Sequence, residues 1–393
     1  MLYLSAFLIY RADPRIAKSP NILYVYLMVS IAFAGGGTGG HIYPGLAVAA
    51  ALKERFPCRI FWIGSNGGMD RSLVEREGLE FFGVPAGKLR RYLSPKNLSD
   101  LFKVGAGFWA ARGILKRERP ALLFSKGGFV SVPPCAAAAS LGIPVFTHES
   151  DYSPGLATRI NARFASRIFV AYGDTAGFFP RALRRKVSVA GNPVRPAFRN
   201  ADPASGRAFL GAGPEERILL VLGGSQGARE INEVVRKTLP TLARHYIVAH
   251  QVGPNQDWDL GASERYRPYA YLQEEMPQVM AAAELVLGRS GAGAVWEAAA
   301  VGKPMALVPL RGSGTRGDQA ENAAFFERAG AAVVVDGGGS PEETAAAVAR
   351  TVCELAENAE RRSAMAAAAA ALGRIDGADL LARAIQAEVA GGA

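Results

Sequence analysis

The sequence has few cysteines, no basic tail and no long apolar run. Its three cysteines, Cys58, Cys135 and Cys353, are scattered and form no CxxC pair, which predicts buried, reduced thiols in a cytosolic protein. No run reaches the ~18 apolar residues that a membrane-spanning helix needs. Zinc-ligand spacing and an aromatic RNA-binding motif are also missing, so we expect no nucleic acid as a partner.

The N-terminus imitates a signal peptide, and we reject that interpretation. Residues 22–34 are apolar, follow Lys18 and end in Ala32-Phe33-Ala34. Cleavage there would remove the strand that must precede the glycine-rich turn at residues 35–40. Met28 opens Met28-Val29-Ser30-Ile31, a natural start for a first strand, so residues 1–27 are expected to be an extension outside the fold.

Two common phosphate-site signatures and one metal-site signature are incomplete or absent. Gly35-x-Gly37-x-x-Gly40 fits the dinucleotide fingerprint, but the expected second strand ends in Ile63-Gly64-Ser65-Asn66, with no carboxylate for a ribose. No Gly-Lys-Ser/Thr follows, which excludes a P-loop. No Asp-x-Asp stands at a strand end, so no metal ion is expected.

The bulk composition suits a two-domain enzyme of acidic substrates. The chain has 393 residues, of which 49% are hydrophobic, and its formal net charge is +10. That length is enough for two domains of ordinary size. The positive charge favours partners that carry phosphate, such as phosphorylated substrates or an anionic lipid surface.

The first glycine-rich turn organises the chain. An apolar strand at residues 29–33 runs into Gly35–Gly40, and a helical pattern follows from Leu46. Glycines let an anion approach the backbone, and the amides at a helix start then face it. His41 adds a group at this turn that could transfer a proton.

Similar strand–glycine–helix units recur along the chain. They lie at residues 121–134, 217–234 and 285–297, and the pattern breaks at residues 191–196. Two successive βαβ halves predict an α/β fold with two doubly wound, Rossmann-like domains that face one cleft.

Several side chains near these turns could serve a nucleotide-sugar transferase. Glu297 could bind a ribose, and Ser225, the turn at 223–227 and Arg195 could stabilise a leaving diphosphate. The candidate bases for an acceptor hydroxyl are His41, His148 and Glu149. The alternative is structural: a Ser or Glu near a helix start is often a cap, and His148 could be a buried core residue.

Residues 86–119 are basic, aromatic and helical in pattern. Among them are Arg90, Arg91, Lys116, Phe108 and Trp109. Such a segment can lie on an anionic membrane surface. In the alternative interpretation Phe102, Phe108 and Trp109 belong to the core and the charges form a solvated face.

Six motifs in order resemble the MurG family of glycosyltransferases (family 28, GT-B architecture). They are GGGTGGHIYP at 35–44, KGGFVSVP at 126–133, His148-Glu149-Ser150, GNPVR at 191–195, GGSQGA at 223–228 and RSGA at 289–292. The resemblance runs from about Met28 to the C-terminus. It implies a single inverting displacement, without metal or cofactor, that moves GlcNAc from UDP-GlcNAc to undecaprenyl-diphospho-MurNAc-pentapeptide (lipid I) and forms lipid II for the cell wall.

The resemblance also assigns regions and residues. It implies an acceptor- and membrane-binding domain at 28–194, a donor domain at 195–373, and a C-terminal helix at 374–393 that packs back on the first domain. His41 would be the general base, with Glu149 as a further catalytic candidate. The acceptor diphosphate would lie at Gly37, Gly127 and Gly128. The donor would lie near Thr38, Gly39, Gly40, Asp151, Arg195, Ser225, Gln273, Ala292, Gly293, Ala294, Val295, Trp296, Glu297 and Gln319.

The family further implies peripheral attachment to the cytoplasmic face of the cell membrane, which favours the membrane interpretation of residues 86–119. The family often has Asn where this chain has Asp151, and an ionised carboxylate accepts but does not donate hydrogen bonds. Three alternatives stay open. One is a transferase to another lipid, such as a diacylglycerol. The second is a UDP-GlcNAc 2-epimerase, which would need more acid–base carboxylates around the donor. The third is a binding-only protein or an NAD oxidoreductase, and the missing carboxylate for a ribose is the feature that discriminates it.

Overall fold

The computed structural model describes residues 28–67, 70–87, 96–224, 227–254, 256, 258–310, 317–338 and 340–391. The expectations for residues 1–27, Arg90, Arg91 and Ser225 therefore lie outside the described residues.

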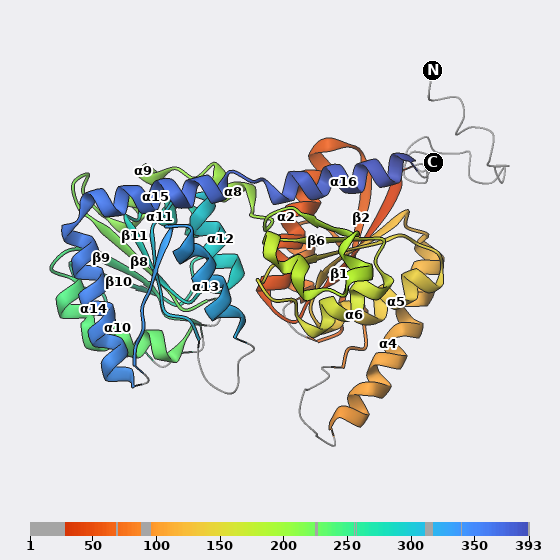
Figure 1. Cartoon of the computed structure of the whole chain (residues 1–393), viewed down its shortest axis with the longest axis horizontal. Coiled ribbons are helices and arrows are strands. Elements are labelled where there is room, and N and C mark those ends of the chain that lie inside the picture. The colour runs from red at the N-terminus through yellow and green to blue at the C-terminus, as the bar shows by residue number, and fades with distance from the viewer. Residues whose placement is uncertain are drawn as a thin grey trace.

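Two parallel sheets form the framework, one in each half of the chain (Figure 1). The first has the order β3-β2-β1-β4-β5-β6-β7, and the second has the order β10-β9-β8-β11-β12-β13. The strands are β1 Val29–Gly35, β2 Cys58–Ser65, β3 Glu80–Val84, β4 Leu122–Gly127, β5 Val145–Glu149, β6 Arg167–Val170, β7 Val187–Val189, β8 Ile218–Leu222, β9 Ile247–Gln251, β10 Tyr266–Tyr269, β11 Leu285–Gly288, β12 Met305–Leu307 and β13 Ala332–Val334. The order reverses between β1 and β4 and between β8 and β11, and such switch points are where open α/β sheets bind ligands.

Helices cover both faces of each sheet. Those of the first half are α2 Gly39–Arg55, α3 Asp70–Arg76, α4 Lys96–Glu118, α5 Val132–Ser140, α6 Leu156–Phe164 and α7 Arg181–Arg184. Those that follow are α8 Pro196–Arg199, α9 Pro203–Leu210, α10 Arg229–Leu242, α11 Met276–Ala282, α12 Ala292–Ala300, α13 Asp318–Arg328, α14 Pro341–Glu357, α15 Ala359–Gly373 and α16 Gly377–Gly391. The prediction of two doubly wound α/β domains is confirmed.

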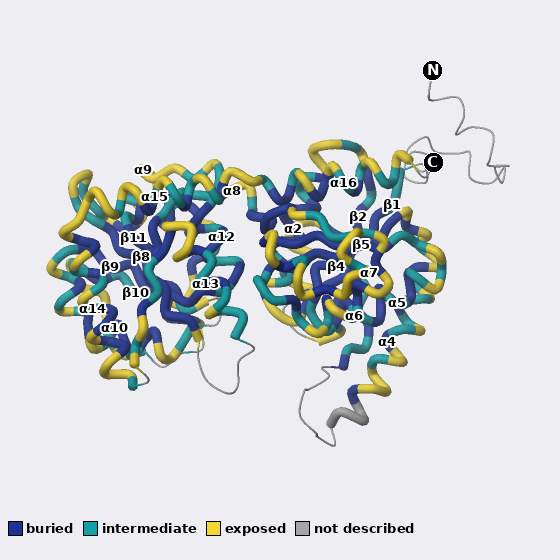
Figure 2. The backbone as a smooth tube through the Cα atoms, viewed as in Figure 1, coloured by how far each residue is buried: buried dark blue, intermediate teal, exposed yellow. Residues whose placement is uncertain are grey.

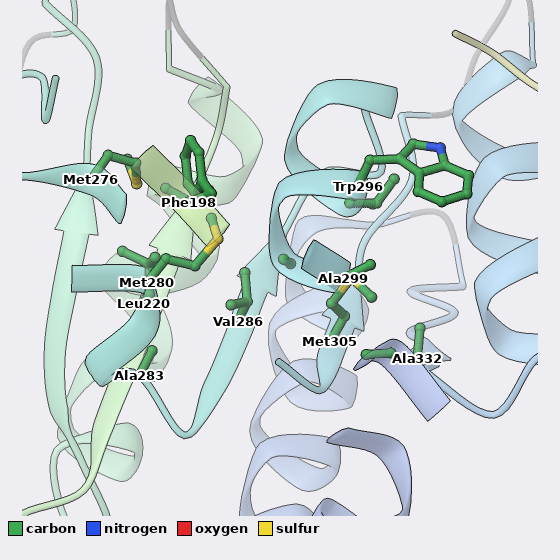
Figure 3. Close-up of a cluster of buried hydrophobic side chains, with 14 of the residues drawn as sticks. Phe198, Leu220, Met276, Met280, Ala283, Val286, Trp296, Ala299, Met305 and Ala332 are labelled. Carbon is green, nitrogen blue, oxygen red and sulfur yellow. The ribbon is translucent and has the colours of Figure 1, made fainter. Parts of the chain in front are cut away.

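The central strands are largely apolar because both faces of each sheet are buried, and the exceptions include Ser125 and Lys126 near the end of β4 (Figure 2). In β8, Leu220 and Leu222 face the cluster that contains α11 and α12, whereas Leu219 and Val221 face α10 and α14. Figure 3 shows part of the first of these clusters, with Met276 and Met280 beside Phe198.

The cysteines are free and largely removed from solvent. Cys58 and Cys135 are buried, and burial raises their pKa values to about 11 and about 12. Cys353 is only half-buried, so the expectation of buried thiols is wrong for this residue. A thiol with a raised pKa stays protonated and poorly nucleophilic at neutral pH.

The alanine-rich tail forms two helices. Helix α15 ends at Gly373, and α16 begins at Gly377 and runs along α2 of the first half (Figure 1). Leu381 and Ile385 of α16 join the core of the first half, and Arg55 of α2 donates to Asp379 at 2.6 Å. The C-terminal helix is therefore built into the first half.

The chain crosses between the halves twice, and the two crossings touch. A Cβ on Gly191, whose φ is +71°, would lie 2.9 Å from Cγ2 of Ile375, and a Cβ on Gly377 would lie 2.9 Å from the carbonyl oxygen of Asn192. Arg199 donates to the carbonyl oxygen of Ile375 at 2.8 Å. Glycine permits the left-handed φ at residue 191 and the approach of the backbone of Gly377 to that of Asn192.

The packing of α15 on α12 predicts a costly Gly373→Ala substitution. The new methyl would overlap the carbonyl oxygen of Ala299 in α12, and such overpacking costs ~1–3 kcal/mol. Gly113→Ala in α4 is the control, because no atom lies within 4 Å of that Cβ. It should gain up to ~1 kcal/mol from helix propensity. Chemical denaturation checks both, and a Gly373→Ala protein as stable as the parent would contradict the packing.

Candidate functional site

A cavity of about 530 Å³ lies between the two halves, at the carboxyl ends of their central strands. The first half contributes the β1–α2 turn and the end of β5, and the second contributes the β8–α10 turn and the start of α12. The expected site residues in its wall are Thr38, Gly39, Gly40, His41, Glu149, Asp151, Arg195, Ala292, Gly293, Ala294, Glu297 and Gln319. One cavity therefore collects most of the expected site from both halves.

Six other expected residues do not line the cavity: Gly37, Gly127, Gly128, Gln273, Val295 and Trp296. The side chains of Val295 and Trp296 are 1% and 3% exposed and belong to the core. Figure 3 shows Trp296 projecting from α12 at the edge of that core. Gln273 is half-buried outside the wall, and its neighbours Tyr271 and Leu272 line the cavity.

The amide of Gly37 is already engaged within the protein. It donates to the carboxylate of Asp70, at 3.0 Å to Oδ1, and Asp70 is 1% exposed. Ser65 also donates its backbone N–H to this carboxylate, at 3.3 Å. Asp70 thus fixes the β1–α2 turn and occupies the amide of Gly37 in this structure.

Helix α2 begins at the cavity without a side-chain cap. Thr38 makes no capping hydrogen bond, and the first turn carries no acidic residue. Backbone amides at an uncapped helix start, together with the helix dipole, favour a negative group. Gly39 and Gly40 lie in the cavity wall at this position. Helix α12 begins at the same cavity, again with no side-chain cap and no acid in its first turn.

His41 lies in the first turn of α2 and in the cavity wall. The end of β4 and the residue after it pack directly against His41. Gly127 and Gly128 have φ values of +83° and +77°, a conformation that favours glycine. A Cβ on Gly128 would lie 3.0 Å from Cδ2 of His41. The glycine pair is therefore a backbone support for the imidazole.

The other two candidate bases make hydrogen bonds within the first half. Glu149 is 5% exposed, and its two carboxylate oxygens accept from the amides of Asp151 and Gly155, each at 3.0 Å. His148 is fully buried, and its Nε2 lies 2.8 Å from the carbonyl oxygen of Gly191. Burial, aided by the nearby charge of Lys126, holds the pKa of His148 well below its usual value. The structural alternative thus applies to His148.

Glu297 and Arg195 pair across the cavity edge. Arg195 approaches Oε1 of Glu297 at 3.4 Å, and its guanidinium lies over the rings of Tyr43 and Phe198 at 4.7 and 4.8 Å. Burial raises the pKa of Glu297, and the charge of Arg195 opposes that shift. Beside this pair the hydroxyls of Tyr43 and Tyr271 are 3.0 Å apart, so α2 touches the second half directly.

Asp151 connects the halves instead of standing alone in the wall. It accepts from Nδ2 of Asn322 in α13 at 3.2 Å, and Oδ1 of Asn322 accepts from the amide of Tyr152 at 2.9 Å. Asn322 also donates to the carbonyl oxygen of Ser290 at 3.1 Å and is fully buried. One amide side chain therefore clamps the loop after β5 to the second half.

Aromatic rings close the same contact between the halves. Tyr172 of the first half packs on Trp296 and Phe325 of the second, at ring-centroid distances of 5.4 and 4.7 Å. Tyr152 lies 6.3 Å from Phe325. Pairs of this geometry add stability beyond their buried area. The side chain of Trp296, a residue that we had expected at the donor, packs in this contact between the halves.

Several residues of the wall were not expected from the sequence, among them the polar side chains of Tyr43, Gln251, Tyr271 and Arg289. Signals for them were present. Tyr43 lies within GGGTGGHIYP and Arg289 within RSGA, while Gln251 ends a strand. Arg289 is 8% exposed, pairs with Glu230 at 2.6 Å and donates to the carbonyl oxygen of Val308 at 3.1 Å, so its guanidinium is held in place in the cavity wall.

The sequence matches the glycosyltransferase family 28 N-terminal domain over residues 31–170 and the C-terminal domain of that family over residues 218–381. The chain belongs to glycosyltransferase family 28. A Treponema denticola relative in this family is 50% identical over 326 residues, which are 78% of this chain and 83% of the relative. Its name is UDP-N-acetylglucosamine--N-acetylmuramyl-(pentapeptide) pyrophosphoryl-undecaprenol N-acetylglucosamine transferase.

Solved structures share the fold of this family 28 chain. Acinetobacter baumannii MurG superposes with a TM-score of 0.67 at 24% identity, covering 91% of this chain and 99% of MurG. A UDP-N-acetylglucosamine 2-epimerase from Listeria monocytogenes reaches 0.64 at 14% identity, covering 91% and 96%. At these identities the likeness concerns architecture alone, and fold does not determine reaction.

The clamp between the halves predicts a large loss of stability for Asn322→Ala. The substitution leaves the amide of Tyr152, the carbonyl of Ser290 and the carboxylate of Asp151 without this partner, and each such buried group costs ~1–3 kcal/mol. Asn200→Ala at an exposed position is the control and should change stability by less than ~0.5 kcal/mol. Equal unfolding free energies for the two variants would show that the clamp contributes nothing.

Proposed function

We propose that this chain transfers GlcNAc from UDP-GlcNAc to O4 of the MurNAc residue of lipid I and so forms the β-1,4 linkage of lipid II. One observation carries the proposal: the uncapped starts of α2 and α12, one from each half, face a single cavity. Two diphosphates can thus be held from opposite walls. The acceptor is taken from the name of the Treponema denticola relative, which is 50% identical to this chain.

The two halves divide the substrates. We propose that residues 195–373 bind the donor and that residues 28–194, with residues 374–393 packed on them, bind the acceptor. In the donor half, the carboxylate of Glu297 accepts hydrogen bonds from the ribose. The start of α12, the turn at Gly223 and Gly224, and the positive charges of Arg195 and Arg289 stabilise the UDP that leaves.

The acceptor half supplies the base. His41 takes the proton from O4 as this oxygen attacks the anomeric carbon, and the bond from that carbon to the UDP phosphate oxygen breaks in the same step. Attack from the opposite face inverts the anomeric centre. The amides at Gly39 and Gly40 orient the acceptor diphosphate. Helix amides and guanidinium groups then carry the charge stabilisation that a metal ion supplies in other transferases.

The deciding assay incubates the full chain with UDP-GlcNAc and a lipid I analogue in the presence of EDTA, and measures UDP release. Release that depends on the acceptor is expected. No release would overturn the transfer, and release abolished by EDTA would overturn the metal-free step. UDP release together with ManNAc formation in the absence of acceptor would instead identify a 2-epimerase.

His41→Ala is expected to lower kcat by roughly 10²- to 10⁴-fold, because a positioned base contributes about that much. His245→Ala, at a half-buried position outside the cavity wall, is the matched control and should keep kcat within about twofold of the parent, as expected for a site remote from the reacting atoms. Near-normal turnover by His41→Ala in the same assay would remove His41 as the base.

We further propose that α4 attaches the first half peripherally to an anionic membrane, at the cytoplasmic face of the cell membrane. No helix in the described ranges combines the length and apolar character needed to cross a bilayer. On α4, Leu101, Phe102 and Trp109 are 58%, 74% and 69% exposed, and Lys116 is also exposed. Phe108 instead packs against the core of the first half. Figure 1 shows α4 projecting from that half.

Removing the apolar residues of α4 should weaken vesicle binding without touching the chemistry. Phe102→Ser with Trp109→Ser is expected to lower partitioning onto phosphatidylglycerol vesicles at least tenfold, because each buried aromatic contributes ~1.5–3 kcal/mol. Phe209→Ser, 42% exposed on α9, is the control and should leave binding unchanged. Turnover of a water-soluble acceptor should be equal in all three proteins. Unchanged partitioning of the α4 variant in a vesicle sedimentation assay would refute the membrane surface.

A further inference from the structure

A lysine is buried beneath the cavity wall. Lys126 stands near the end of β4, just before Gly127 and Gly128, and is 2% exposed. Its Nζ donates to Oγ of Ser150 at 2.6 Å, and Ser150 donates in turn to Oδ1 of the buried Asn192. The hydrogen-bonded chain thus runs from β4 through the loop after β5 to the connection between the halves.

An ammonium group is rarely buried unless opposite charges compensate it. The compensating carboxylates here belong to Glu149 and Asp151, which flank Ser150 in the cavity wall. Burial lowers the pKa of Lys126 to about 8, and these two carboxylates oppose that shift. The adjacent His148 stays neutral, because its pKa is held well below the usual value. Lys126 is therefore the positive member of this buried group at neutral pH.

The hydrogen-bonded chain joins three parts of the catalytic half. Gly127 and Gly128 follow Lys126 and support His41 from behind. Ser150 belongs to the cavity wall, and Asn192 lies between Gly191 and Pro193 in the first crossing. Gly191 packs on Ile375 of the second crossing. A displacement of the ammonium would therefore change the positions of the glycine pair, of Ser150 and of Asn192.

We propose that Lys126 is a positioning residue for the transfer. Its ammonium is hydrogen-bonded through Ser150 to Asn192 in the connection between the halves. These bonds hold in place the adjacent glycine pair, which supports His41. The base and the acceptor-side wall are therefore held in place relative to the connection between the halves. This inference rests on the proposed function, because it assigns a role in the transfer to a residue that touches neither substrate.

The test replaces the charge and keeps the volume. Lys126→Met, Ser150→Ala and the double variant are compared with Lys186→Met, a half-buried first-half lysine that donates to the carbonyl oxygen of Ala165. Kinetic constants are measured for UDP-GlcNAc and for the lipid I analogue, and UDP affinity is measured by calorimetry.

Lys126→Met is expected to lower kcat at least tenfold and to raise the acceptor KM, with the Kd for UDP unchanged within twofold. Because the two groups act in one chain, the double variant should be no worse than Lys126→Met. Lys186→Met should behave as the parent. A loss of kcat with both KM values unchanged, in proportion to lost folded protein, would show a merely structural lysine and overturn the proposal.

The pH profile gives a second, independent readout. The ammonium form is present below the pKa of Lys126 and is lost as the pH rises through about 8. The charged or titratable neighbours are Glu149, Asp151 and His148. The parent's kcat should therefore fall above about pH 8, and Lys126→Met should lack this alkaline fall. Parent activity with an unaffected Lys126→Met overturns this inference alone, whereas a parent without transfer activity overturns the proposed function as well.

Discussion

The contact between the two chain crossings is the constraint on which the cavity depends. Gly191 and Gly377 bring the crossings within van der Waals distance, and Arg199 holds the second crossing by its carbonyl groups. Helix α16 then runs on into the core of the first half. Both sheets connect to this contact between the crossings, and their switch points therefore face one another. A larger side chain at either glycine would push the crossings apart and change the shape of the cavity.

Three acidic side chains at or near the cavity are engaged by the protein itself. Asp70 accepts from the β1–α2 turn, Glu149 accepts from the loop after β5, and Asp151 accepts from Asn322. Each carboxylate is bound by N–H donors that would otherwise face the interior. The uncapped helix starts and the guanidinium groups of Arg195 and Arg289 lie in the same wall, an arrangement that favours a ligand carrying phosphate.

The same architecture serves other reactions, so the reaction follows from the residues in the wall. The likeness to a 2-epimerase covers nearly the whole chain at 14% identity and carries no information about chemistry. The wall of this cavity holds His41 on the start of α2, supported by glycine backbone, and the carboxylate of Glu297 on α12. Of the other two candidate bases, Glu149 accepts from the amide of Gly155, and Nε2 of His148 lies 2.8 Å from the carbonyl oxygen of Gly191.

Local patterns in the sequence were enough to predict the α/β class, the glycine turns and the place of His41. Turn glycines and apolar strands act over a few residues, so their consequences can be derived without the rest of the fold. The pattern could not show that Asp70 occupies the amide of Gly37, that Trp296 packs between the halves, or that Lys126 reaches Asn192. The long-range pairings among these depend on how distant segments are brought together.

The sequence by itself determined which strands are buried on both faces and which helices begin at glycine, because burial pattern and backbone freedom are local properties. Only the tertiary structure decided which polar groups face the cavity and which are used inside the protein. The physical reason is that a buried donor or acceptor must find a partner, and its partner is chosen by proximity in space.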